Sequence, residues 1–195
     1  MFFTRSGTPS DALHVHPSLR TRGNVMTPVG AVARGLAAAA VGTLAMDLLL
    51  FARYKRGDGK TGFREWELSE GIESWDQAPA PAQVGKRLVE GLFQRDLPDR
   101  LAPLVNNITH WGYGIVGGAP YGLVVGSLTR NRVWFGVLFG AGVWGSGYVV
   151  LPAAGLYQPI WEYDRRTLAN DLSAHLVYGL TTAAVFRALS PRRGR

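Results

Sequence analysis

The sequence predicts an all-α membrane protein in which four transmembrane helices form two repeated helical hairpins. Hydrophobic residues make up 47% of the 195 positions and charged residues only 18%, with 25 glycines and six tryptophans, and that charged fraction is below the roughly 25% of a typical soluble domain. Four weakly charged apolar stretches each match the ~20 residues that a helix needs to cross a bilayer. They are residues 29–52, 104–128, 133–157 and 167–189.

The four predicted spans form one transmembrane domain, residues 29–190, flanked by polar segments. Residues 1–28 lack the continuous apolar core of a cleavable signal and are expected to be a disordered cytoplasmic tail, and residues 191–195 form a basic tail. The connection 53–102 is charged but carries apolar residues at helical spacing on either side of an APAP break. It is therefore expected to hold short amphipathic helices at the membrane interface. These apolar residues are Leu68, Ile72 and Trp75, then Val84, Leu88, Val89, Leu92 and Phe93.

The net charge of +7 is placed as in a membrane protein rather than a nucleic-acid-binding protein. Basic residues with few acids among them precede the first span, separate the second from the third, and follow the fourth. The positive-inside tendency then places both termini in the cytoplasm of a bacterium, with the chain crossing the plasma (inner) membrane several times. Arg53, Lys55 and Arg56 follow the first span on the opposite side and count against this orientation.

The expected partners are the lipid bilayer and a second copy of the chain or another membrane subunit. Nucleic acid is not expected, because the basic residues lie at the span ends. A nucleotide is not expected either: GDGKTG at 57–62 resembles a phosphate-binding loop, but Tyr54 stands where that motif requires glycine and no strand precedes it.

A polar motif occurs twice inside the apolar stretches, as HWGYG at 110–114 and as HLVYG at 175–179. Residues spaced i, i+4 and i+7 share one face of a helix. One face of the second span is therefore predicted to carry Asn106, His110 and Tyr113, and the same face of the fourth span to carry Asp171, His175 and Tyr178. Two helical hairpins related by an internal repeat would place these residues at equivalent depths.

Together with Asp47 of the first span, these residues are predicted to form a polar layer within one leaflet. Ionisable groups in a bilayer are costly unless they are paired or hydrated, so the layer should face the bundle interior. Above it, three residues of the loop between the third and fourth spans are candidates to cover the layer: Trp161, Glu162 and Asp164.

Several roles for the layer remain open. It could join helices through hydrogen bonds alone, or it could line a cavity that carries protons or binds a small solute. A metal site of Asp47, His110, Asp171 and His175, or a haem between the two histidines, is chemically possible. Without cysteine a thiolate site is excluded, and no metal or other cofactor is expected. The favoured function is a permeation or accessory module rather than an enzyme, and the alternative is a structural or partner-binding membrane subunit.

The C-terminal half reads GVWGSGYVVLPAAGLYQPIWEYDRRTLANDLSAHLVYG, in which a span ends in an LP-x-x-GL-x-x-P motif before an acidic residue and a Ser–x–His helix. This pattern resembles the YagU-like family of uncharacterised bacterial inner-membrane proteins. The resemblance implies a plasma-membrane location and no particular activity or cofactor. The positions that carry it are Pro152, Gly155, Leu156, Pro159, Glu162, Ser173 and His175.

Overall fold

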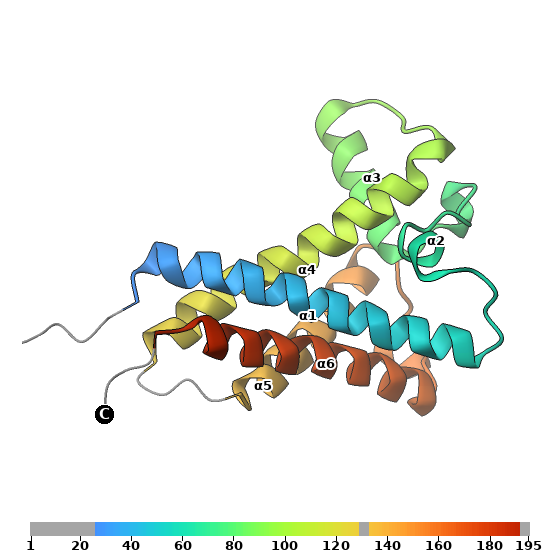
Figure 1. Cartoon of the computed structure of the whole chain (residues 1–195). Helices are drawn as coiled ribbons and strands as arrows, with labels where there is room; N and C mark the ends of the chain where they lie inside the picture. The colour runs from blue at the N-terminus through green and yellow to red at the C-terminus, as the bar shows by residue number, and fades with distance from the viewer. Residues whose placement is uncertain (1–25, 129–132, 192–195) are drawn as a thin grey trace, which may run out of the picture.

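The computed structural model describes residues 26–128 and 133–191, and every regular element within these ranges is a helix. The predicted tails 1–28 and 191–195 fall almost entirely outside them. Four long helices form a bundle in which α1 and α5 run in one direction and α4 and α6 in the other (Figure 1). Their bounds are α1 Pro28–Arg56, α4 Ala102–Ser127, α5 Phe135–Ala153 and α6 Arg165–Leu189.

The bundle therefore has two distinct ends. The terminal end carries the start of α1 and the end of α6, and the connection end carries residues 57–101 and 154–164 (Figure 1). The first turn of α1 is capped by Thr27, whose hydroxyl accepts a hydrogen bond from the Gly30 amide. At the connection end Asp164 caps α6 by accepting bonds from Thr167 and Arg166, and these bonds hold the pKa of this carboxyl below its usual range.

Three of the described helices are long and apolar enough to cross a membrane: α1, α5 and α6. The chain is therefore compatible with a multi-pass membrane protein, and large apolar side chains such as Leu48, Leu138 and Val149 face outward. The helix at the predicted second span, α4, does not meet the same measure. Asn106, Asn107 and several glycines interrupt its apolar residues, so the structure does not confirm four spans.

Glycines bring the long helices into backbone contact. A Cβ on Gly35 of α1 would overlap the Gly118 carbonyl of α4, and a Cβ on Gly136 of α5 would overlap the Gly179 carbonyl of α6. Small residues at a helix interface allow this close approach, which gains van der Waals contact without requiring a hydrophobic driving force. The hairpins α1–α4 and α5–α6 are thus closely packed pairs, and α1 also packs along α6.

The internal repeat is not confirmed by this packing. If α1 matched α5 and α4 matched α6, the extensive contact of α1 with α6 would have a counterpart between α5 and α4. Instead α4 and α5 touch at few positions, and α4 rises away from α1 toward α3 at the connection end (Figure 1). Near the terminal end Tyr121 of α4 does meet Phe139 of α5 and Phe186 of α6, and these rings form the core there.

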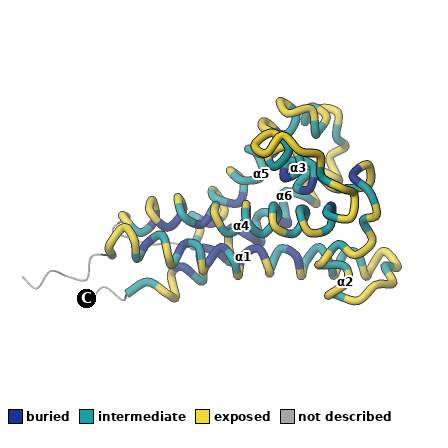
Figure 2. The backbone as a smooth tube through the Cα atoms, turned by 90° about the horizontal axis from the view of Figure 1, so that it is seen from above, coloured by how far each residue is buried: buried dark blue, intermediate teal, exposed yellow. Residues whose placement is uncertain are grey.

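The connection contains one amphipathic helix of the expected kind rather than two. The second predicted helix is confirmed as α3, Ala80–Phe93, which packs on α4 through Ala82 and Gly85 and leaves Leu88, Leu92 and Phe93 exposed (Figure 2). The first predicted helix, which was expected to carry Leu68, Ile72 and Trp75 on one face, was wrong in its position. The helix here, α2, is Phe63–Glu67, and the chain turns at Ser69, whose φ is +58°.

That turn sends Trp75 into a small core of the connection instead of onto a shared helix face with Leu68. Trp75 is buried against Ala82 and Ala102, and its indole N–H donates to the Leu97 carbonyl at 2.8 Å. Three short 3₁₀ helices complete the described structure: η1 Trp75–Gln77, η2 Asp99–Leu101 and η3 Ile160–Glu162.

Replacing Gly118 by alanine should destabilise the fold, because the new methyl group would collide with the Gly35 backbone. We expect Gly118→Ala to lower the free energy of unfolding by roughly 1–3 kcal/mol. The matched control is Gly112→Ala on the same helix, where a Cβ meets nothing within 4 Å, so the better helix propensity of alanine should leave stability unchanged or raise it by up to about 1 kcal/mol. Denaturant unfolding of detergent-solubilised protein measures both, and equal stabilities would contradict the close helix contact.

Candidate functional site

The predicted polar layer is divided between two cavities at the connection end. The acidic cavity, about 710 Å³, lies between α1, α4 and residues 61–81 of the connection. The bundle cavity, about 380 Å³, lies between the four long helices and the start of α3. Both volumes are in the range of small-molecule sites. His110 lines both cavities, so its imidazole stands at the boundary between them.

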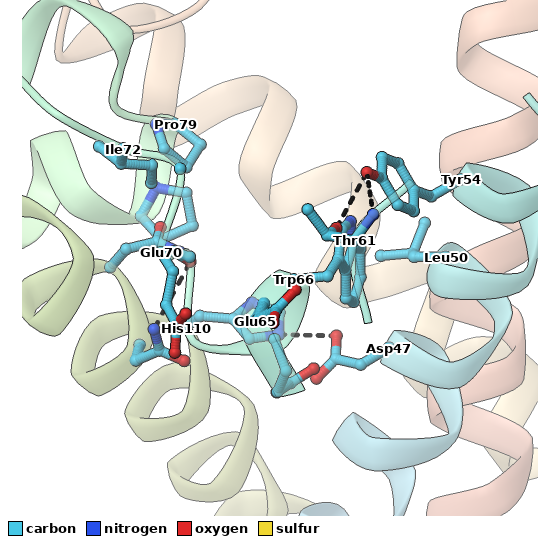
Figure 3. Close-up of a pocket in the computed structure, with 16 residues that line it drawn as sticks. Asp47, Leu50, Tyr54, Thr61, Glu65, Trp66, Glu70, Ile72, Pro79 and His110 are labelled. Carbon is cyan, nitrogen blue, oxygen red and sulfur yellow. Dashed lines mark hydrogen bonds and ion pairs between the residues drawn. The ribbon is translucent and has the colours of Figure 1, made fainter. Parts of the chain in front are cut away.

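Asp47 and His110 form a hydrogen-bonded pair between α1 and α4. The Nε2–H of His110 donates to Oδ1 of Asp47 at 2.9 Å, and Asp47 is only 3% exposed (Figure 3). The second carboxylate oxygen, Oδ2, is buried and has no hydrogen-bond partner among the described residues. Asp47 faces α4 because α1 packs closely against that helix, so this pairing depends on the helix contacts described above.

Glu67 is a member of the acidic cavity that the sequence analysis did not single out. Its Oε1 accepts a hydrogen bond from the indole N–H of Trp111 at 2.7 Å. Burial raises the pKa of Glu67, and the negative charge of Asp47 raises it further against the lowering effect of the Trp111 bond. The only sequence signal was a run of acids, EWELSEGIE, in an otherwise basic chain.

Asn106 also lies in the acidic cavity. Its Nδ2 donates to the Ser69 hydroxyl at 2.8 Å, which ties α4 to the turn after α2. Its Oδ1 is buried and, like Oδ2 of Asp47, has no donor among the described residues. Two acceptors in one cavity are therefore left without partners.

Asp171 and His175 form a second and separate pair on α6, in the bundle cavity. His175 Nδ1 lies 3.0 Å from the Asp171 carbonyl and 3.3 Å from its Oδ1, while the Tyr148 hydroxyl of α5 donates to Oδ2 at 3.0 Å. The two histidines thus differ in their partners. His110 is paired with a carboxylate on another helix and His175 with one on its own helix.

The two tyrosines of the repeated motif also differ. Tyr178 is 2% exposed, and its hydroxyl donates to the Gly114 carbonyl at 2.6 Å, which joins α6 to α4 across the bundle. Tyr113 is 60% exposed and lies 3.2 Å from the Ser146 hydroxyl of α5. Equivalent positions of the motif therefore have different environments.

The structure does not assemble the four-residue metal set of Asp47, His110, Asp171 and His175. Within residues 26–128 and 133–191 no group of three or more His, Asp and Glu side chains could hold a metal ion. The physical reason is that the two pairs belong to different cavities, since Asp47 lines the acidic cavity and Asp171 the bundle cavity.

The loop residues that were expected to cover the layer are placed elsewhere. Trp161 is 80% exposed, Asp164 caps α6, and neither these two nor Glu162 lines the acidic or the bundle cavity. The start of α3 contributes to the bundle cavity instead, through Ala80, Pro81 and Val84.

No protein-family model, curated protein or solved structure matches this chain. The resemblance of the C-terminal half to the YagU-like family therefore has no support from these comparisons. The evidence for function is the geometry of the site.

The raised pKa of Glu67 gives a pH-dependent contribution to stability. Because the folded-state pKa lies above the ordinary value, this contribution is fully present below the ordinary glutamate range and is lost as pH rises through the raised pKa. Glu67→Gln cannot ionise but can still accept the Trp111 bond. From about pH 4 to about pH 8, wild-type stability should therefore fall relative to that of Glu67→Gln.

Thermal unfolding in detergent across this pH range measures the difference. Glu73→Gln, which removes an exposed acid of the same connection outside both cavities, is the control and should follow the wild type. A Glu67→Gln curve parallel to the wild-type curve would contradict the raised pKa.

Proposed function

We propose that this chain is a polytopic membrane protein, with α4 as its fourth span, that admits a small solute or protons into a polar layer between its helices. The observation that carries the proposal is the position of His110. Its imidazole borders both cavities and is paired with the buried carboxylate of Asp47. A histidine and a carboxylate placed side by side between two cavities can both exchange hydrogen bonds with a polar solute, which suits a site that admits protons or solutes.

The bundle favours entry from the connection end. Exposed residues of the connection, among them Thr61, Glu65 and Glu70, line the acidic cavity. At the terminal end the rings of Tyr121, Phe139 and Phe186 fill the core. A solute that enters from the connection end would therefore stop at the polar layer. To cross the membrane it would need the contact between Tyr121 of α4 and Phe139 of α5 to open.

We further propose that the protein lies in a bacterial plasma membrane with both termini in the cytoplasm and the connection end outside the cell, the orientation that the positive-inside tendency favours. Arg53, Lys55 and Arg56 together count against this orientation, and the structure gives Arg53 a packing role. Its guanidinium donates to the Asn170 carbonyl and to the Ser173 hydroxyl, both at 2.7 Å, so it joins α1 to α6. A basic residue with this packing role is weaker evidence for a cytoplasmic loop.

The alternative is a structural or partner-binding subunit, in which the layer only holds the helices together. The bonds from Tyr178 to Gly114 and from Arg53 to α6 favour it, because they join helices without lining an acidic site. In this alternative no water reaches the layer, and its polar groups form hydrogen bonds only with one another. Hydration of the bundle cavity therefore distinguishes the two functions.

The absence of cysteine allows hydration to be tested with single cysteines. In membranes, Ser146→Cys in the bundle cavity should react with a small impermeant cationic thiol reagent, because thiols react as thiolates in water. Thr182→Cys, at a fully buried position, and Val149→Cys, at a position 70% exposed on the outside of α5, should not react. Mass spectrometry reads the labelling, and an unreactive Ser146→Cys would favour the structural subunit.

Orientation is tested by the same chemistry on intact cells. Gln77→Cys and Glu162→Cys, both exposed at the connection end, should be labelled from outside, whereas Ser127→Cys at the far end of α4 should be labelled only after permeabilisation. The opposite labelling pattern would indicate the inverse orientation. Labelling of all three cysteines from outside would indicate that α4 does not cross the membrane.

A further inference from the structure

The acidic cavity has a charge opposite to that of the protein. The chain carries a net charge of +7, yet four carboxylates line this cavity: Asp47, Glu65, Glu67 and Glu70. No lysine or arginine is among the lining residues, and His110 is the one side chain there that can become positive. A group of acids with no lysine or arginine beside it and a single histidine partner attracts a cation from solution.

Two buried acceptors in this cavity point to a donor-bearing ligand. Asp47 is 3% exposed and lines the cavity, and its Oδ2 has no hydrogen-bond partner among the described residues; the same is true of Oδ1 of Asn106. A buried carboxylate oxygen without a donor costs free energy, more than a neutral group would. His110 bonds to the other oxygen of Asp47, and Glu67, which also interacts with Asp47, can donate to it only in its protonated form. When both carboxyls are ionised, the donor must come from a ligand.

We propose that the acidic cavity binds a small organic cation, whose ammonium group donates hydrogen bonds to Asp47 and Glu67 and to the free oxygen of Asn106. This assignment rests on the proposed function, because it names the class of solute that the polar layer admits. An ammonium group has three N–H donors and no acceptor, which matches a set made of two carboxylates and one amide oxygen. Hydrogen bonds from a cation to carboxylates are about twice as strong as neutral ones.

The remaining walls favour an organic cation over a metal ion. Tyr54 and Trp66 present aromatic rings, and Leu50 and Ile72 present apolar surface, to the same cavity (Figure 3). Aromatic faces attract cations and also pack against a hydrocarbon body, whereas metal ions need several oxygen or nitrogen ligands at short distance. The described residues offer no such metal-binding group.

The surroundings of Glu67 agree with a site for a positive group. Burial first, and the negative charge of Asp47 after it, raise the pKa of Glu67, and a cation bound between the two carboxyls would oppose both effects. Besides Asp47, the other ionisable groups lining the cavity are Glu65, Glu70, His110 and Tyr54. Glu65 accepts the Gly62 amide at 3.1 Å and caps α2, so it holds the wall of the cavity rather than the ligand.

The probe for the test is benzylammonium, added to purified full-length protein in detergent, with benzyl alcohol as its neutral counterpart. Benzylammonium should raise the midpoint of thermal unfolding saturably and quench tryptophan fluorescence, since Trp66 lines the cavity and Trp111 bonds to Glu67. Benzyl alcohol should do neither at the same concentration. Asp47→Asn and Glu67→Gln should each weaken benzylammonium binding about tenfold or more, as expected for loss of a charged hydrogen bond.

Glu67→Gln is the variant expected to keep the fold, because α2 lies outside the bundle and the glutamine can still accept the Trp111 bond. Loss of binding in this variant is therefore not explained by misfolding. Glu73→Gln, outside the cavity, should bind like the wild type. Equal binding of benzyl alcohol, no saturable binding of benzylammonium, or unchanged affinity in both acidic variants would overturn the cation site. If Ser146→Cys still reacts in that case, the proposed function stands without this ligand class, and if Ser146→Cys is also unreactive, both proposals fail.

Discussion

The contact of α1 with its neighbours is the constraint on which the rest of the structure depends. Glycines let α1 approach α4 so closely that a single added methyl group at Gly35 or Gly118 would overlap backbone. That contact sets the rotation of α1 and so places Asp47 against His110. In a bilayer, where helices gain little from the hydrophobic effect, such backbone contact and the buried polar pair determine which faces meet.

The same packing makes the bundle unequal along its length. At the terminal end aromatic rings from α4, α5 and α6 meet and fill the core. At the connection end α4 packs on α3, and space remains for the acidic and bundle cavities. This asymmetry separates a closed half from a half with accessible polar groups, and the proposed entry of a solute from the connection end rests on it.

Charge is distributed in a complementary way. Basic side chains hold elements together, as Arg34 does by donating to the Leu189 carbonyl at 2.9 Å and Arg53 by donating to α6. Acids gather where the connection folds over the bundle, with no lysine or arginine lining their cavity and with His110 bonded to Asp47 alone. A protein that is basic overall thus keeps one acidic cavity, and the free oxygen of Asp47 lies within it.

Hydropathy and helical spacing alone predicted the helical class, the positions of the long helices and the helix α3, because these properties follow from local sequence. They also located both histidines and their neighbouring polar residues. The i, i+4 spacing placed Asp171 and His175 on one helix face, but it did not reveal that Asp47 pairs with His110 or that Glu67 joins that pair. Those partners are distant in sequence, and only the packing of α1 between α4 and α6 and the turn at Ser69 decide which side chains share a cavity.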